Sequence, residues 1–226
     1  MNPLIPALDS DDEQQLLGWA QALAPTSGHL KIGLQAFTTF GPQLVTRTAR
    51  LAPIFLDLKL HDIPNTVAGA AAAVASLGQD GHGVAMLTVH ASGGPAMVAA
   101  AVKAAPEVSI LAVTVLTSLD DEALHLLGLP SADQLVPTLA VAAIQAGAAG
   151  VVCAAAEIGA VRSAIGPQPL IVVPGIRPEN SAADDQARVA SPRQAIQSGA
   201  SHIVVGRPIT AARDPVTAAR AILASL

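Results

Sequence analysis

The sequence predicts an α/β protein, a (β/α)8 barrel formed by one domain over residues 1–226. Short apolar runs alternate with alanine-rich stretches of helical periodicity, and eight such pairs fill the chain at about 28 residues each. Runs that are apolar almost throughout are typical of parallel strands covered on both faces. A doubly wound open sheet is the alternative, because eight βα units do not by themselves require the sheet to close.

Eight apolar runs are expected to form the strands, at 4–9, 29–34, 53–60, 83–90, 109–116, 150–155, 170–176 and 202–207. Helices are expected between them, at 11–24, 36–50, 64–78, 94–105, 132–147, 156–165, 191–198 and 214–225. Two helix starts have a clear chemical signal. In Ser191-Pro192 and Asp214-Pro215, an N-cap residue precedes a proline at the first helical position.

The composition argues against several classes of protein. With 51% hydrophobic and 13% charged residues, the chain can bury a core and does not resemble a disordered protein. The net charge of −5 argues against a nucleic-acid partner. The apolar runs are too short and interrupted for a membrane span, and the acidic start does not fit a signal peptide. One cysteine, Cys153, cannot form an internal disulfide, which agrees with the cytoplasmic location that we expect.

Charged residues gather at the predicted carboxyl ends of the strands, where this fold places its chemistry. Asp57 and Lys59 are two residues apart on one strand, so their side chains share a face, and Lys31 on the neighbouring strand can reach them. Together with Asp62 they would form a network of alternating charge. This network is either a salt-bridge cluster that fixes strand register or a site that holds the Lys59 ammonium between carboxylates as a proton donor.

A second set of polar residues lies at the ends of the last two predicted strands, where this fold commonly binds phosphate. Arg177 and Arg207 are suited to bidentate phosphate contacts, and Gly206 offers a backbone N–H. The alternative is that both arginines make surface ion pairs. The polar stretch 178–190, which contains Gln186, is expected to be a lid or binding loop.

No metal or dinucleotide site is expected, because the sequence has no CxxC, HExxH, Walker A or strand-linked GxGxxG motif. His90 stands at a predicted strand end, and its role is left open. His61 adjoins the charged network but would face the opposite way if the strand continued. Cys153 lies in an apolar run and is expected to be a buried small side chain.

These motifs resemble the bacterial form of orotidine 5'-phosphate decarboxylase. The resemblance runs in order along nearly the whole chain, through ALD at 7–9, KIGLQAFTTFGP at 31–42, FLDLKLHDIPNTV at 55–67, TVHASGG at 88–94, VTVLTS at 113–118, PGIRP at 174–178, DDQARVASP at 184–192 and VGRPIT at 205–210. The central DxKxxD pattern belongs to a wider superfamily, whereas HDIPNT together with PGIRP and GRPIT is more specific.

The resemblance implies a (β/α)8 barrel and an obligate homodimer that converts orotidine 5'-phosphate to UMP with loss of CO2, without a cofactor, in pyrimidine biosynthesis. It implies that Lys59 is the proton donor, flanked by Asp57 and Asp62, and that Asp62 and Thr66 come from the partner subunit. Further implied contacts are the ribose with Asp9 and Lys31, the pyrimidine with Thr117, and the phosphate with Arg177, Gln186, Gly206 and Arg207. The chain has no tyrosine, so a tyrosine contact to phosphate used by some relatives is absent.

Three other functions stay open on the residues alone. A sister decarboxylase of sugar phosphates, such as 3-keto-L-gulonate 6-phosphate decarboxylase, would share DxKxxD but would use Mg²⁺. A Schiff-base aldolase would also place a lysine on a strand, although acidic neighbours favour a charged Lys59. A non-catalytic binder of nucleotide phosphates would have no need of the Lys59 network.

Overall fold

The computed structural model describes residues 2–178 and 190–226, and in it eight parallel strands form one sheet in the order β1-β8-β7-β6-β5-β4-β3-β2. The strands are β1 (Leu4–Pro6), β2 (Leu30–Gly33), β3 (Ile54–Leu60), β4 (Val84–His90), β5 (Ser109–Val113), β6 (Gly150–Val152), β7 (Leu170–Val173) and β8 (His202–Val205). A parallel bridge between Ala7 and Lys31, with a hydrogen bond of 2.9 Å from the Leu8 N–H to the Lys31 carbonyl oxygen, joins β1 to β2. The sheet therefore closes, and the predicted (β/α)8 barrel is confirmed over the open alternative.

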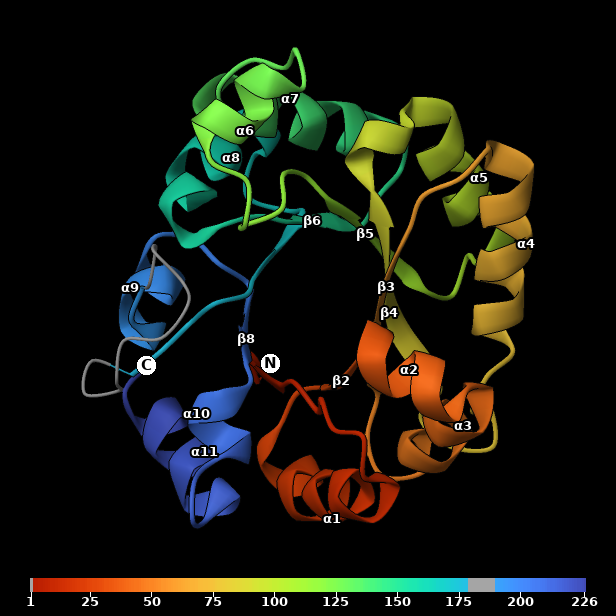
Figure 1. The fold of residues 1–226 in the computed structure, drawn as a ribbon, viewed down its shortest axis with the longest axis vertical. Coiled ribbons are helices and arrows are strands. Elements are labelled where there is room, and N and C mark those ends of the chain that lie inside the picture. Colours follow the sequence, from red (N-terminus) through yellow and green to blue (C-terminus); the bar gives the residue numbers. More distant parts are fainter. Residues whose placement is uncertain (1, 179–189) are drawn as a thin grey trace.

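Helices follow the strands and surround the barrel (Figure 1). They are α1 (Glu13–Leu23), α2 (Leu34–Phe40), α3 (Pro42–Ala49), α4 (Pro64–Ala75), α5 (Pro95–Ala104), α6 (Asp121–Leu126), α7 (Ala132–Gln145), α8 (Ile158–Ile165), α9 (Pro192–Gln197), α10 (Arg207–Thr210) and α11 (Pro215–Ala224). Short 3-10 turns lie at Ala24–Thr26, Ala91–Gly93 and Ala155–Glu157. Within the described ranges, none of the helices combines the length and apolar character needed to cross a membrane.

Side chains define two of the helix starts, as predicted. Ser191 Oγ accepts a hydrogen bond from the Gln194 N–H (3.3 Å), and the Gln194 side chain accepts one from the Ser191 N–H (3.2 Å), which forms a capping box for α9. Asp214 Oδ1 accepts hydrogen bonds from the N–H groups of Val216 (3.0 Å) and Thr217 (3.1 Å) at the start of α11. Each cap satisfies backbone donors that have no partner inside the helix.

Several element boundaries differ from the prediction, and four strands end about three residues earlier than expected: β1, β5, β6 and β7 end at Pro6, Val113, Val152 and Val173. The expected helix at 36–50 is two helices, because Gly41, with a φ of +70°, and Pro42 interrupt it. The six-residue α6 is too short to show a clear period and was not predicted. Strand β8 ends at Val205, so Arg207 begins the short helix α10 instead of ending the strand.

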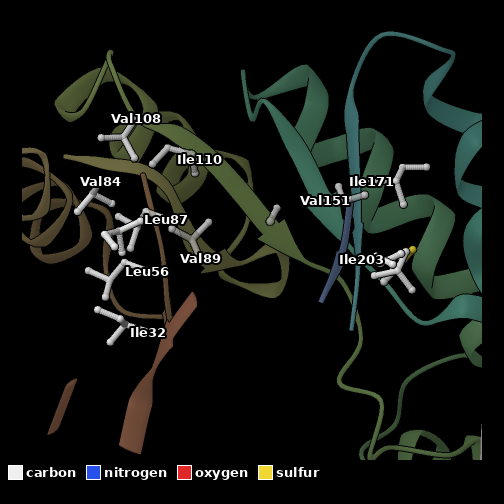
Figure 2. Close-up of a cluster of buried hydrophobic side chains, with 14 of the residues drawn as sticks. Ile32, Leu56, Val84, Leu87, Val89, Val108, Ile110, Val151, Ile171 and Ile203 are labelled. Atoms are coloured by element: carbon white, nitrogen blue, oxygen red, sulfur yellow. The ribbon is translucent and has the colours of Figure 1, made fainter. Parts of the chain in front are cut away.

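Apolar side chains fill both sides of the barrel wall. Those on the outer face pack against the helices, and Figure 2 shows part of this core, including Ile32, Leu56 and Leu87. The alternate side chains form a smaller cluster inside the barrel: Ile5, Ala7, Phe55, Met86, Leu111, Val113, Val152, Val172 and Val204. Ala7, Phe55, Val152 and Val204 of this cluster also line the cavity described next, so the inner core forms its floor.

Candidate active site

A cavity of about 270 Å³ lies at the carboxyl ends of the strands. Its polar lining brings together seven residues that the sequence predicted for the site: Asp9, Lys31, Asp57, Lys59, Arg177, Gly206 and Arg207. They come from β1, β2, β3, β7 and β8 or the segments that follow these strands. The barrel thus gathers in one place charges that are up to about 200 positions apart in the chain.

Asp57 is the centre of a chain of ion pairs. Lys59 Nζ donates a hydrogen bond to Asp57 Oδ1 over 2.8 Å, and Lys31 Nζ lies 3.3 Å from Asp57 Oδ2. Lys31 Nζ also lies 3.8 Å from Asp9 Oδ2. The charges therefore alternate in sign from Lys59 through Asp57 and Lys31 to Asp9, so each lysine faces at least one carboxylate.

The environment of Asp57 keeps its carboxyl group ionised. Burial by itself would raise the pKa of Asp57, because desolvation disfavours a charge. The positive charges of Lys31 and Lys59, with hydrogen bonds from Lys59 and Thr88, outweigh burial and bring the pKa below its ordinary value. At neutral pH, Asp57 is thus a fixed negative charge between two ammonium groups.

The backbone at Lys59 is not a regular strand. Leu56 pairs with Leu87 and Leu60 pairs with Val89, so four steps along β3 match two steps along β4. Lys59 has a φ of +51°, and no other non-glycine residue in the described ranges has a positive φ. The sequence predicts that Asp57 and Lys59 share one face of a regular strand; their side chains do meet, at 2.8 Å, but across an irregular register, a bulge in β3, instead of through regular alternation.

Two histidines lie beside the lysine site. The ring centroids of His61 and His90 are 5.3 Å apart. Burial lowers the pKa of His90, the charges of His61 and Lys59 lower it further, and Asp57 acts in the opposite direction. His90 is therefore mostly neutral at neutral pH and does not add a positive charge next to Lys59.

Three predicted residues do not line the main cavity. Asp62 and Thr66 are exposed in the segment that follows β3, and Asp62 Oδ1 accepts a hydrogen bond of 2.6 Å from the Ile63 N–H. Within residues 2–178 and 190–226 of one chain, Asp62 makes no ion pair, so the expected network of four lacks it. Thr117 is exposed and lines a small neighbouring cavity of about 20 Å³, which shares Pro174 and Gly175 with the main one.

The predicted phosphate residues lie on the side of the cavity formed by β7 and β8. Arg177 is 8% exposed, and its N–H donates a hydrogen bond of 3.2 Å to the Ala190 carbonyl oxygen. Gly206 precedes α10, and Arg207 is exposed at its first position. Gln186, with most of the expected loop at 178–190, lies outside the described residues.

Two residues that the sequence analysis did not single out support the charged group. Thr88, fully buried in β4, donates a hydrogen bond of 3.0 Å to Asp57 Oδ1. A Cβ atom at Gly33 would lie 2.8 Å from Asp9 Oδ1 and 2.9 Å from Lys31 Nζ, so a larger residue would displace this ion pair from its present position. A polar residue inside an apolar strand was the available signal for Thr88, and a glycine two positions after a site lysine was the signal for Gly33.

Cys153 lies away from this chemistry. It is 1% exposed, as expected, and burial, followed by the charge of Glu157, raises the pKa of its thiol to about 12. A thiol with so high a pKa has almost no thiolate form at neutral pH. Among the described residues, no three His, Cys, Asp or Glu side chains are grouped so that they could hold a metal ion.

Residues 2–222 match the model of the Orotidine 5'-phosphate decarboxylase / HUMPS family. The chain is 56% identical over 211 residues to orotidine 5'-phosphate decarboxylase from Anaeromyxobacter sp. (strain K), covering 92% of this chain and 91% of that protein. It is 50% identical over 228 residues to orotidine 5'-phosphate decarboxylase from Thermobifida fusca, covering 99% and 95%. The crystal structure of orotidine 5'-phosphate decarboxylase from Lactobacillus acidophilus has a TM-score of 0.87 and 37% identity, covering 100% and 99%. The predicted resemblance is thereby confirmed, and the chain belongs to the Orotidine 5'-phosphate decarboxylase / HUMPS family.

Proposed function

We propose that this protein decarboxylates orotidine 5'-phosphate to UMP in pyrimidine biosynthesis, without a cofactor. The observation that supports this most directly is the group of Lys31, Asp57 and Lys59 at the cavity, in which a lysine is held as an ammonium against a fixed carboxylate. Similarity at 50% identity or more to proteins named orotidine 5'-phosphate decarboxylase supports the choice of substrate.

The reaction leaves a negative charge on one carbon atom of the substrate and therefore needs a positively charged group beside that atom. When CO2 leaves C6 of the pyrimidine, the electrons of the broken bond stay on C6 in the plane of the ring, where no neighbouring carbonyl delocalises them. Without a cofactor as electron sink, the site must stabilise this anion electrostatically. In our proposal the Lys59 ammonium is the counter-charge and then gives its proton to C6.

The neighbours of Lys59 prepare it for this role. Asp57 accepts a hydrogen bond from Lys59 Nζ over 2.8 Å and so fixes the position of that nitrogen, while Lys31 faces the second oxygen of the same carboxylate. Repulsion between Asp57 and the substrate carboxylate would add ground-state destabilisation, which we rank below electrostatic stabilisation. Asp9 and Lys31 would bind the ribose.

The phosphate would bind far from the reacting carbon. Arg177, Gly206 and Arg207 border the β7–β8 side of the cavity, and Gln186 is assigned to the same role by the family resemblance alone. Phosphate contacts there would orient the pyrimidine and so contribute to the chemical step. Thr117 would contact the pyrimidine from the adjoining small cavity.

We also propose a homodimer in which Asp62 and Thr66 of each chain complete the site of the other. The segment that contains them is exposed in one chain, and Ile63 within it is 66% exposed. Mixing Lys59→Ala and Asp62→Ala subunits tests this directly. Each homodimer would be impaired, but the mixed dimer would contain one complete site, so recovered activity supports a shared site and no recovery contradicts it.

The activity is tested by adding purified protein to orotidine 5'-phosphate and following the loss of orotidine absorbance and the formation of UMP. We expect turnover that a chelator does not change and that 6-azauridine or barbiturate monophosphate inhibits. Dependence on Mg²⁺ with a sugar phosphate would favour the sister decarboxylase instead. Trapping of substrate by borohydride would favour the aldolase, and binding without turnover would favour the non-catalytic function.

A further inference from the structure

The hydroxyl group of Thr88 joins two parts of the charged site. Thr88 is fully buried in β4 and faces the bulge of β3. Its Oγ1 lies 2.8 Å from the Lys59 backbone nitrogen and 3.0 Å from Asp57 Oδ1. The N–H of Lys59 can only donate and an ionised carboxylate can only accept. The hydroxyl therefore accepts from Lys59 and donates its single hydrogen to Asp57.

The first of these hydrogen bonds supports an unusual backbone. The φ of +51° at Lys59 is in the left-handed region, which disfavours a residue with a Cβ atom. The register between β3 and β4 is interrupted from Leu56 to Leu60, so the ordinary ladder does not continue through Lys59. The Thr88 hydroxyl takes the place of a ladder carbonyl for the Lys59 N–H, a group that would be costly to bury without a partner.

The second hydrogen bond orients the carboxylate that holds the lysine. Asp57 Oδ1 accepts from Lys59 Nζ at 2.8 Å and from Thr88 Oγ1 at 3.0 Å, while Oδ2 faces Lys31 Nζ at 3.3 Å. Two hydrogen bonds to Oδ1 and one ion pair at Oδ2 together fix the plane of the carboxylate. Loss of the Thr88 donor would let this plane turn, and the ammonium that it positions would move with it.

We propose that Thr88 is a positioning residue of the decarboxylation site, because its hydroxyl holds both the Lys59 backbone and the Asp57 carboxylate in the arrangement that presents the Lys59 ammonium to the cavity. Thr88 acts through these two residues and does not line the cavity itself. Its expected effect on turnover rests on the proposed function, whereas its effect on Asp57 does not.

The test compares Thr88→Val, which removes the hydroxyl at nearly constant shape, with Thr88→Ser, which keeps it. For Thr88→Val we expect kcat to fall on the order of 10- to 100-fold, because a small displacement of a reacting group has effects of this size. KM should change by less than about threefold, and Thr88→Ser should keep most of the activity. If Thr88→Val does not fold, Thr88→Cys, whose thiol is a weak donor, is expected to show the same fall.

Thr48→Val is the matched control. Thr48 is also fully buried, but its hydroxyl bonds only to the Leu44 carbonyl oxygen in its own helix (2.9 Å). We expect this variant to keep wild-type kcat. The inference is overturned if Thr88→Val turns over like wild type, if its loss equals that of Thr48→Val, or if Thr88→Ser loses as much as Thr88→Val.

A second measurement does not depend on turnover. A carbon-13 NMR titration of the Asp57 carboxyl group should show a higher pKa in Thr88→Val than in wild type, since a donor to the ionised form is lost. An unchanged titration overturns the inference whatever the substrate is. If wild type does not decarboxylate orotidine 5'-phosphate but the titration shifts, the proposed function fails and the positioning of Asp57 by Thr88 is upheld.

Discussion

At the carboxyl end of the barrel, Asp57 lies between two ammonium groups, whereas at the amino end His202 lies beside a second imidazole, His29, with ring centroids 5.5 Å apart. Both are removed from water: 13% of the Asp57 side chain is exposed and His202 is 0% exposed. Burial would raise the pKa of Asp57, but the lysine charges lower it. Burial, with a smaller effect of His29, lowers the pKa of His202 to about 4.

The two ends differ in whether the buried titratable group has a polar partner: Asp57 has two lysines, whereas His202 has no hydrogen-bond partner among the described residues. Neither ring nitrogen of His202 has a hydrogen-bond partner among the described residues, and the same is true of His29 Nδ1. A neutral ring can be buried in this way at moderate cost, but a charged one cannot. The carboxyl end keeps its charges because opposite charges surround them. This agrees with the division of the fold into a face for chemistry and a face for stability.

The first prediction removes one of the charged partners that distinguish the carboxyl end. In Lys59→Ala, Asp57 loses one of its two counter-charges and keeps only Lys31. We expect decarboxylation to fall by about 10⁴-fold or more, because electrostatic stabilisation and proton donation are lost together. The absorbance assay measures the loss, and calorimetry should show that UMP still binds. Lys103→Ala, at an exposed position in α5, is the matched control and should keep full activity. Turnover near the wild-type rate in Lys59→Ala would refute the assigned role.

The fold and the position of the site could largely be predicted because both depend on patterns local in the sequence. Apolar runs mark the strands, and charges such as Asp57 within β3 and Arg177 shortly after β7 mark the end of the barrel that carries the site. The break at Gly41-Pro42 also had a local signal, but the helical period on either side masked it. Each of these features needs only a few adjacent residues to be recognised.

The features that could not be predicted depend on contacts between segments. The bulge at Lys59 arises from the register of β3 against β4, and lysine has no preference for a positive φ that would reveal it. The role of Thr88 follows from the same register. Asp62 is a different case, because in the proposed dimer its partner belongs to another chain.

The second prediction concerns the pH dependence of stability at the amino end. An unfolded histidine has a pKa of about 6.5, and His202 in the folded protein has a pKa of about 4. Between these values the unfolded chain binds more protons, so stability is lost as pH falls from 6.5 to 4. The full loss is about 3 kcal/mol. The lowered pKa of Asp57 has its own effect only below pH 3.8, so the amino end responds to acid first.

Urea unfolding at pH 7 and pH 4 measures this difference, with His202→Leu as the comparison. The variant should lose about 3 kcal/mol less than wild type between the two pH values, because leucine takes up no proton. Its turnover at pH 7 should equal that of wild type, since His202 is at the opposite end from the cavity. Parallel pH curves for the two proteins would show that His202 is not a buried neutral base.

Arg207→Ala tests an exposed charge at the carboxyl end. We expect kcat/KM for orotidine 5'-phosphate to fall about 10- to 100-fold, the usual effect of losing hydrogen bonds to a charged group. Activity on the unphosphorylated nucleoside should not change. Arg213→Ala is the matched control, because Arg213 is exposed nearby but does not line the cavity. An equal loss on both substrates would argue against a phosphate contact.

The smallest expected effect concerns glycines at the two ends. At Gly33 (φ −96°), alanine fits the backbone, but its Cβ would press on the ends of Asp9 and Lys31, which can move aside. We expect Gly33→Ala to lower kcat/KM about tenfold through the displaced ion pair, and to cost less than about 1 kcal/mol of stability. At Gly150, at the amino end of β6, a Cβ would lie 2.3 Å from the Leu170 carbonyl oxygen, which cannot move aside.

Gly150→Ala should therefore lower the free energy of unfolding by about 1–3 kcal/mol and leave kcat/KM of the folded protein unchanged. Denaturant unfolding and the absorbance assay on both variants separate the two effects. A variant pair in which Gly33→Ala loses only stability, or Gly150→Ala loses only activity, would contradict the division. The opposite outcomes are expected because the same added methyl group meets movable charged side chains at one end and fixed backbone at the other.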